Sequence, residues 1–177
     1  MYQPTEIIVT PRLRLRSLDL TDLQLLHDHV LSDAAVMALA LSGQPMSSLE
    51  SREFIDRNFD HDASGKKLGV LIERATEQVI GFAGLLQCDV LGEPNYELGF
   101  VLRRSAWGHG YAAEIGRGQL EYGFNVVGLR RLLALVSPKN NASIAVLKKI
   151  GMEFHSTVHD AQRGDRHVYV ARNDKER

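Results

Sequence analysis

Two closely spaced glycines, Gly108 and Gly110, mark the stretch of this sequence whose residue types could bind a phosphate. Residues 96–102 before them alternate with period two, as a strand does. Residues 113–127 after them repeat apolar or small residues at steps of three and four, as a helix does. A glycine turn between a strand and a helix directs free backbone N–H groups and the positive end of the helix dipole at one point. The pattern therefore predicts the anchoring site of a cofactor that carries a diphosphate.

The turn must be held by neighbouring elements, and the rest of the sequence predicts what they are. Consecutive strands in the middle of the chain favour antiparallel pairing, and the strand–helix–strand unit over 96–136 favours a parallel crossover. The sequence therefore predicts an α/β (α+β) fold with a mixed, mostly antiparallel sheet of about seven strands and about four helices. Strands are expected near residues 12–18, 68–73, 79–86, 96–102, 132–136, 154–158 and 167–171, and helices near 19–41, 48–61, 113–127 and 141–150.

Length, charge and cysteine content limit the class of protein. At 177 residues the chain is expected to form one domain, residues 1–177. Its formal net charge of -1 gives no electrostatic reason to expect a nucleic acid or a membrane surface as partner. No apolar run reaches transmembrane length, and the start of the chain lacks the pattern of a signal peptide. Together with the single cysteine, Cys88, these features favour a cytoplasmic protein.

Two blocks of the sequence resemble the signatures of a known superfamily. Residues 107–114, Trp-Gly-His-Gly-Tyr-Ala-Ala-Glu, are similar to the acyl-CoA pyrophosphate loop of the GNAT N-acyltransferases. Residues 140–152, which begin Asn-Asn-Ala-Ser and end Leu-Lys-Lys-Ile-Gly-Met, resemble the second signature of that superfamily. Residues 12–18 and 79–82 resemble one branch, the acetyltransferases that act on the N-terminal amine (alanine or serine) of ribosomal proteins. The resemblance covers residues 10–171 and implies a GNAT-like fold.

The resemblance also implies which residues bind acetyl-CoA as co-substrate. In the family pattern, Gln or Arg is followed after two residues by Gly and, one residue later, by Gly or Ala. Here Trp107, Gly110 and Ala112 take those places; tryptophan departs from the pattern but is usual in this branch. Asn140 is implied to contact the pantetheine region. The full set of implied cofactor-binding residues is Val101, Leu102, Trp107, Gly108, His109, Gly110, Tyr111, Ala112 and Asn140.

The implied reaction is the attack of a neutral amine on an acyl thioester. Near neutral pH a lysine amine, with a pKa of ~10.4, costs roughly 4 kcal/mol to deprotonate, whereas an α-amine costs under about 1 kcal/mol. A weak base therefore suffices for an N-terminus, and Glu97, beside the expected cofactor arm, is the candidate base. Many relatives supply a tyrosine as acid at the position of Leu147. Ser143 is the substitute candidate for the acid, with helix capping as its alternative role.

Alternative interpretations of these residues remain open. Residues 108–113 also fit a loose G-x-G-x-x-A dinucleotide fingerprint, which would indicate an oxidoreductase, although no Asp or Glu ends the next strand. A non-catalytic acyl-CoA sensor could use the same fold. His27, Asp28, His29 and His61 lack the spacing of a metal site, so no metal is expected.

The sequence does not identify the amine acceptor. A protein N-terminus, a polyamine, an antibiotic amine and a free amino acid all agree with the predicted chemistry. Residues 23–59 and the last predicted hairpin are expected to select among them, because loops and short helices of this kind carry specificity. The sequence also leaves open whether the protein forms a homodimer.

Overall fold

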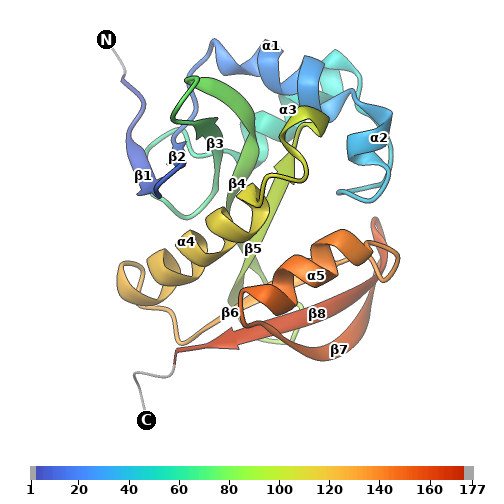
Figure 1. Cartoon of the computed structure of the whole chain (residues 1–177). Coiled ribbons are helices and arrows are strands. Elements are labelled where there is room, and N and C mark those ends of the chain that lie inside the picture. The colour runs from blue at the N-terminus through green and yellow to red at the C-terminus, as the bar shows by residue number, and fades with distance from the viewer. Residues whose placement is uncertain (1–2, 174–177) are drawn as a thin grey trace.

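The computed structural model describes residues 3–173. Within these residues eight strands form one sheet in the order β1-β2-β3-β4-β5-β6-β8-β7, and only β5 and β6 pair in parallel. The predicted mixed, mostly antiparallel α/β fold is confirmed (Figure 1). Met1 and Tyr2, part of the basis for the expectation about the start of the chain, lie outside the described residues.

The bounds of the elements agree closely with the sequence pattern in the second half of the chain and less closely in the first. The strands are β1 (Glu6–Val9), β2 (Leu13–Arg16), β3 (Leu68–Glu73), β4 (Gln78–Cys88), β5 (Asn95–Leu102), β6 (Arg131–Val136), β7 (Glu153–Asp160) and β8 (Gly164–Arg172). The α-helices are α1 (Asp22–Leu26), α2 (Ala34–Met37), α3 (Ser48–Asn58), α4 (Tyr111–Asn125) and α5 (Asn141–Lys149). A π-helical turn η1 (His27–Leu31) follows α1, and a 3-10 turn η2 (Arg104–Ala106) follows β5.

Two differences from the predicted elements lie before residue 45. The sequence Glu-Ile-Ile-Val forms β1, a short strand that the pattern analysis did not predict, and it pairs with β2. The single helix expected over 19–41 is divided into α1, η1 and α2, because Asp33 accepts hydrogen bonds from the N–H groups of Ala35 and Val36 and so starts a new helix. No helix among residues 3–173 combines the length and the apolar character needed to cross a membrane.

Helices cover both faces of the sheet. The side chains of β3 alternate: Leu71 packs in the cluster beneath α4, whereas Val70 and Ile72 pack in the cluster beneath α1–α3. Farther along the sheet, α5 packs over β6 and β8 on the same side as α4, through Leu147. Figure 1 shows α1–α3 with β1–β4 in one half of the molecule and α5 with β6–β8 in the other, with β5 between them.

The sheet opens between β5 and β6. The two strands pair at one position, Glu97 with Leu133, whereas β5 pairs with β4 over its whole length from Asn95 to Leu102. Beyond Glu97 the edge of β5 is therefore left without a neighbouring strand among the described residues. An unpaired backbone edge inside a sheet is costly unless other groups satisfy it, so this opening is the first place to look for a ligand.

Candidate active site

The glycine turn predicted to bind a phosphate lies at the end of the opening between β5 and β6. Gly108 has φ +76° and Gly110 has φ +79°, both in the left-handed region. A Cβ atom on Gly108 would meet nothing within 4 Å, so the backbone conformation, not lack of space, requires glycine there. The two residues bend the chain so that α4 starts at Tyr111.

The turn and the first residues of α4 leave a run of backbone N–H groups without acceptors. Trp107 N–H donates to the Arg104 carbonyl (3.1 Å), and the next backbone N–H along the chain with an acceptor is that of Glu114, which donates to the Gly110 carbonyl (3.1 Å). Among the described residues the N–H groups of residues 108–113 have no acceptor. Because the start of the 15-residue helix α4 also carries partial positive charge, this run fits the diphosphate of a cofactor.

Arg12 of the β1–β2 turn holds this loop in place, a role that the sequence patterns did not reveal. Its Nη1 donates to the His109 carbonyl (2.9 Å), its Nε donates to Glu114 Oε2 (2.6 Å), and its guanidinium lies 4.6 Å from the centre of the Tyr111 ring. Thr10 Oγ1 also donates to Glu114 Oε1 (2.6 Å). Although burial opposes it, these hydrogen bonds lower the pKa of Glu114, so the carboxylate stays charged beside Arg12.

Trp107 connects the loop to the end of β5. Its indole Nε1 donates to the Leu102 carbonyl (2.8 Å), and its own N–H is already bonded to Arg104. Trp107 therefore shapes the loop, and its backbone N–H is not free for a ligand. Of the predicted loop residues, Gly108, His109, Gly110, Tyr111 and Ala112 retain free N–H groups.

The register of β5 decides which backbone groups face the opening. Arg103 N–H donates to the Ile80 carbonyl (2.9 Å), and hydrogen bonding alternates along an antiparallel pair. Val101 therefore directs its backbone groups toward β4, and Phe100 and Leu102 direct theirs toward the opening. Of the two β5 residues that the resemblance implied in cofactor binding, Leu102 faces the opening with its backbone and Val101 does not; Phe100 was not predicted.

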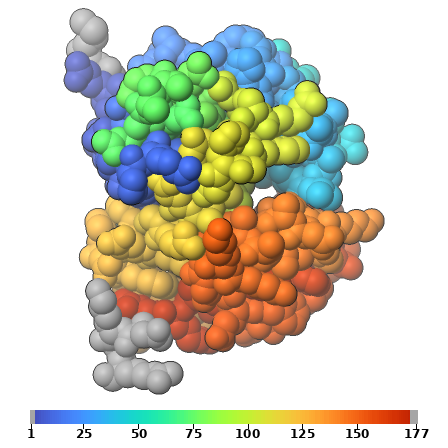
Figure 2. All heavy atoms as spheres, in the orientation of Figure 1, coloured from blue at the N-terminus to red at the C-terminus, as the bar shows by residue number. Residues whose placement is uncertain are grey.

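Two cavities meet beside this edge. The larger, of about 470 Å³, runs along the glycine loop between α2, the end of β5 and the start of α5. The smaller, of about 130 Å³, continues past the β5–β6 opening to the β7–β8 hairpin. Figure 2 shows the surface hollowed between the yellow loop region and the orange α5. The residues that border both cavities are Leu39, Ala40, Phe100, Val101, Asn140 and Ser143.

Glu97 lies in the smaller cavity, at the one position where β5 and β6 pair. Its side chain is 14% exposed; Oε1 accepts from Arg163 Nη1 at 3.4 Å, and the buried Oε2 has no hydrogen-bond partner among the described residues. Burial raises the pKa of Glu97, and Arg163 opposes that shift. The carboxylate is thus suited to take or hold a proton, and the role of Glu97 as a base stays a prediction.

Asn140 and Ser143 both border the two cavities at the start of α5. Asn140 Oδ1 accepts from the Ser143 N–H (3.1 Å) and caps the helix, so it has a structural role in addition to any contact with a ligand. The Ser143 hydroxyl lies half-buried between the cavities, whereas Leu147, one turn later, packs in the core. Ser143 is the one hydroxyl-bearing residue of α5, and it borders both cavities.

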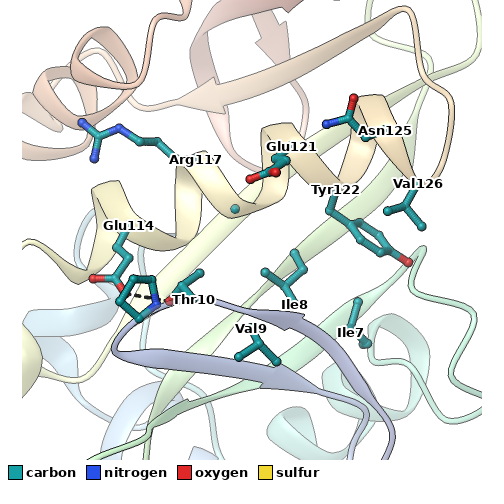
Figure 3. A pocket seen from close by; sticks show the side chains of 12 residues that line it. Ile7, Ile8, Val9, Thr10, Glu114, Arg117, Glu121, Tyr122, Asn125 and Val126 are labelled. Atoms are coloured by element: carbon teal, nitrogen blue, oxygen red, sulfur yellow. Dashed lines mark hydrogen bonds between the residues drawn. The ribbon is translucent and has the colours of Figure 1, made fainter.

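A third hollow, of about 460 Å³, lies between β1 and α4 (Figure 3). Its Glu114 carboxylate is already bonded to Thr10, as the dashed line shows, and its Ile7, Ile8 and Val126 are apolar. Its other charged side chains, Arg117 and Glu121, are exposed, so it offers no buried carboxylate comparable to Glu97. Over residues 3–173 no cluster of three or more His, Cys, Asp or Glu could hold a metal ion.

The sequence is similar to a family model and to known proteins. The model of the acetyltransferase (GNAT) domain matches residues 12–153. The uncharacterized protein YkkB of Bacillus subtilis (strain 168) is 32% identical over 85% of this chain and 87% of its own. The uncharacterized N-acetyltransferase YnaD of the same organism is 32% identical over 82% of this chain and 81% of its own.

Solved structures share the fold. An acetyltransferase (GNAT family) from Bacillus anthracis superposes with a TM-score of 0.78 at 25% identity, covering 95% of this chain and 98% of its own. RimL, a ribosomal L7/L12 alpha-N-protein acetyltransferase in complex with coenzyme A, has a TM-score of 0.75 at 18% identity, covering 97% of this chain and 100% of its own. Spermidine N-acetyltransferase from Vibrio cholerae, in complex with CoA and spermine, has a TM-score of 0.73 at 18% identity, covering 92% of this chain and 96% of its own. At 18% identity the last two show the fold alone.

The glycine loop gives a first testable prediction. Gly108→Ala forces a left-handed residue with a Cβ into the loop and should lower the free energy of unfolding by about 1 to 2 kcal/mol. Because the displaced N–H groups no longer converge, coenzyme A should bind about tenfold more weakly by isothermal titration calorimetry. Gly92→Ala is the matched control, since Gly92 also has φ +76° with nothing within 4 Å but lies outside the cavities. Equal loss of affinity in both variants would contradict the assignment.

Cys88 gives a second prediction. Burial, followed by the charge of Glu97, raises the pKa of the Cys88 thiol to about 11. Only about one thiol in a thousand is then ionised at pH 8, so a thiol-reactive reagent should modify native Cys88 at least about 100-fold more slowly than the unfolded chain. A comparison of modification rates with and without denaturant measures this ratio, and similar rates would refute it.

Proposed function

Because this chain belongs to the GNAT family and is an acetyltransferase, we propose that it moves the acetyl group of acetyl-CoA directly to a primary amine where its two cavities meet. The observation that carries the proposal is the continuity between the run of free N–H groups at residues 108–113 and the unpartnered carboxylate oxygen of Glu97. We also assign the whole chain, residues 1–177, to one domain of this kind.

The residues of the larger cavity fit coenzyme A. Its diphosphate would accept hydrogen bonds from N–H groups of Gly108, His109, Gly110, Tyr111 and Ala112. The pantetheine arm would lie along the open edge of β5, where the Phe100 and Leu102 backbones face the cavity, and would pass Asn140. The complexes of RimL and the spermidine acetyltransferase with coenzyme A, which share this fold, support coenzyme A as the cofactor.

The proposed transfer can be written with every proton placed. A protonated amine first loses one proton to Glu97, directly or through a water. The nitrogen lone pair then attacks the thioester carbonyl carbon; the C–N bond forms, the C–S bond breaks, and the thiolate leaves. The nitrogen releases a second proton and the thiolate takes one up, so the products are an amide, free coenzyme A thiol and one proton.

Glu97 and Ser143 are proposed to divide the proton transfers. Glu97 is the base because its buried Oε2 has no partner and its pKa is raised toward the working range. Ser143, half-buried between the cavities, is positioned to donate a hydrogen bond to the departing sulfur. Its N–H is held by Asn140, which fixes the start of α5 and therefore the place of the hydroxyl.

Direct transfer is favoured over an acyl-enzyme. The only cysteine, Cys88, has a pKa raised to about 11 by burial, so it is a poor nucleophile near neutral pH. It lies on β4 in the cluster with Val90 and Leu133 and borders neither cavity. Membership of the GNAT family also removes the dinucleotide-binding oxidoreductase from consideration.

The proposed activity is tested by an acceptor screen. The protein should release coenzyme A thiol from acetyl-CoA in the presence of at least one member of a panel of peptides with free N-termini, polyamines, aminoglycosides and free amino acids. Acetyl-CoA, but not NAD or NADP, should raise the melting temperature. A rise in melting temperature without thiol release from any amine would favour the acyl-CoA sensor instead.

The role of Glu97 gives a pH-dependent prediction. A base whose pKa is raised is active above that pKa, so wild-type kcat/KM should fall as the pH drops through a value higher than the ordinary ~4.3 of a glutamate. Glu97→Gln removes the base, and kcat should fall about 10²-fold or more while the acid limb of the pH profile disappears.

The matched control is Glu93→Gln. Glu93 precedes β5 and pairs with Arg131 of β6 at the surface, where its side chain is 60% exposed and outside both cavities. This variant should keep the wild-type pH profile. An unchanged acid limb in Glu97→Gln would show that another group sets the pH dependence.

A further inference from the structure

We propose that the acceptor is a small amine that also carries a carboxylate, of which a free amino acid is the simplest case, and that Arg166 pairs with that carboxylate. The inference rests on the proposed acetyl transfer at Glu97 and adds the chemical class of the acceptor. It comes from three features of the 130 Å³ cavity: an unbalanced buried guanidinium, the carboxylate beside it, and the small size of the enclosure.

Arg166, at the start of β8, is buried without a carboxylate of its own. It is 7% exposed, borders the smaller cavity, and its Nη2 donates to the Leu41 carbonyl (2.8 Å). Among the described residues no carboxylate lies within ion-pair distance of its guanidinium. Burial and then the charge of Arg163 lower the pKa of Arg166, and the charges of Asp160 and Glu97 oppose that shift without cancelling it. A buried charge of this kind is stabilised when an anion binds beside it.

Arg163 differs from Arg166 because its charge is already matched. Its Nη1 lies 3.4 Å from Glu97 Oε1 and its Nε lies 3.2 Å from Asp160 Oδ2. The other oxygen of Asp160 accepts from the backbone N–H groups of Gln162 and Arg163, so Asp160 is held in the turn. Asp160 does not border the cavity. The charged side chains that do border it are two arginines and one glutamate, and because Asp160 also pairs with Arg163, Arg166 is the arginine left without an ion-pair partner.

A molecule with both an ammonium and a carboxylate matches these groups. Its nitrogen would approach the unpartnered Oε2 of Glu97, and its carboxylate would approach Arg166, whose planar guanidinium suits carboxylates. A polyamine would bring further positive charge toward Arg163 and Arg166, which disfavours it. The enclosure of about 130 Å³ is also below the range of about 300–1,000 Å³ typical of drug-sized ligands, which favours a small acceptor.

The transfer itself stays balanced as before. The α-nitrogen gains the acetyl group and loses two protons, coenzyme A leaves as the thiol after taking one of them, and the carboxylate of the acceptor is unchanged. The product is an N-acetyl amino acid that still carries its negative charge for Arg166 to hold.

The first experiment changes only the acceptor. The protein is supplied with acetyl-CoA and, in parallel, with each standard L-amino acid, the matching α-carboxamide, and spermidine, and thiol release is followed. For the preferred side chain, kcat/KM should be at least about tenfold higher with the free acid than with its amide, because the amide cannot form the charged pair. The amide has the more easily deprotonated amine, so simple reactivity would give the opposite order.

The second experiment changes Arg166. Arg166→Gln should reduce the preference for the acid over its amide to about onefold, mainly through KM, and Arg166→Lys, which keeps the charge, should retain part of it. Arg172→Gln, at the exposed end of the same strand, should keep the full preference. Calorimetric titration of the amino acid into the protein saturated with coenzyme A should show the same order of affinities, without any turnover.

The outcomes separate the two proposals. No thiol release from any amine would defeat the proposed function as well as this inference. Turnover with acid and amide equal, or with spermidine preferred, would overturn the inference alone and leave the acetyltransferase. A preference that survives in Arg166→Gln would overturn the role of Arg166. Should Arg166→Gln fail to fold, the comparison of acid and amide with the wild-type protein still tests the acceptor class, and Arg166→Lys still tests the role of Arg166.

Discussion

The site depends on backbone hydrogen bonds that the sheet does not form. The strands β5 and β6 are paired at Glu97 and Leu133 and then separate, so the far edge of β5 has donors and acceptors without a strand to receive them. One of these groups, the Leu102 carbonyl, is satisfied by the indole of Trp107. Unpaired polar groups beside a cavity cost free energy until a ligand with its own amides replaces the missing strand, and a pantetheine arm has such amides.

The glycine loop after β5 depends in addition on a matched pair of charges. Glu114, in the first turn of α4, would by itself repel a diphosphate placed at that helix end, although the helix dipole favours its charge. Arg12 pairs with Glu114 and also binds the His109 carbonyl, so the negative charge is matched and the loop is fixed by one side chain. The free N–H groups then act on a ligand without competition from a nearby anion. The β1–β2 turn thus contributes to the proposed cofactor site, which is formed mainly by residues about 100 positions later.

Local patterns predicted what is local. Period-two alternation and the glycine pair predicted the strand–turn–helix around Gly108. The direction of the β5 backbone groups could not be predicted in this way, because alternation tells which face of the sheet a side chain occupies but not which edge of the strand a backbone group faces. Only the hydrogen bond from Arg103 to Ile80 shows that the backbone of Val101 faces β4 and that of Leu102 faces the opening. The arginines around Glu97 were missed because 66 or more residues separate them from it, and their sequence reads as an ordinary charged turn.

The distance between Arg163 and Glu97 decides how the carboxylate can behave. A short, two-pronged ion pair would stabilise the charged form and pull the pKa of Glu97 below its usual value. Here the Nε of Arg163 is bonded to Asp160, and Arg163 makes a single contact of 3.4 Å with Glu97. Burial therefore outweighs the effect of Arg163, and the pKa of Glu97 is raised. An arginine held by a third group lets a buried glutamate keep its proton affinity. Asp160 and its turn therefore influence the carboxylate of Glu97 without bordering the cavity, and they connect the β7–β8 hairpin to the reaction proposed at β5.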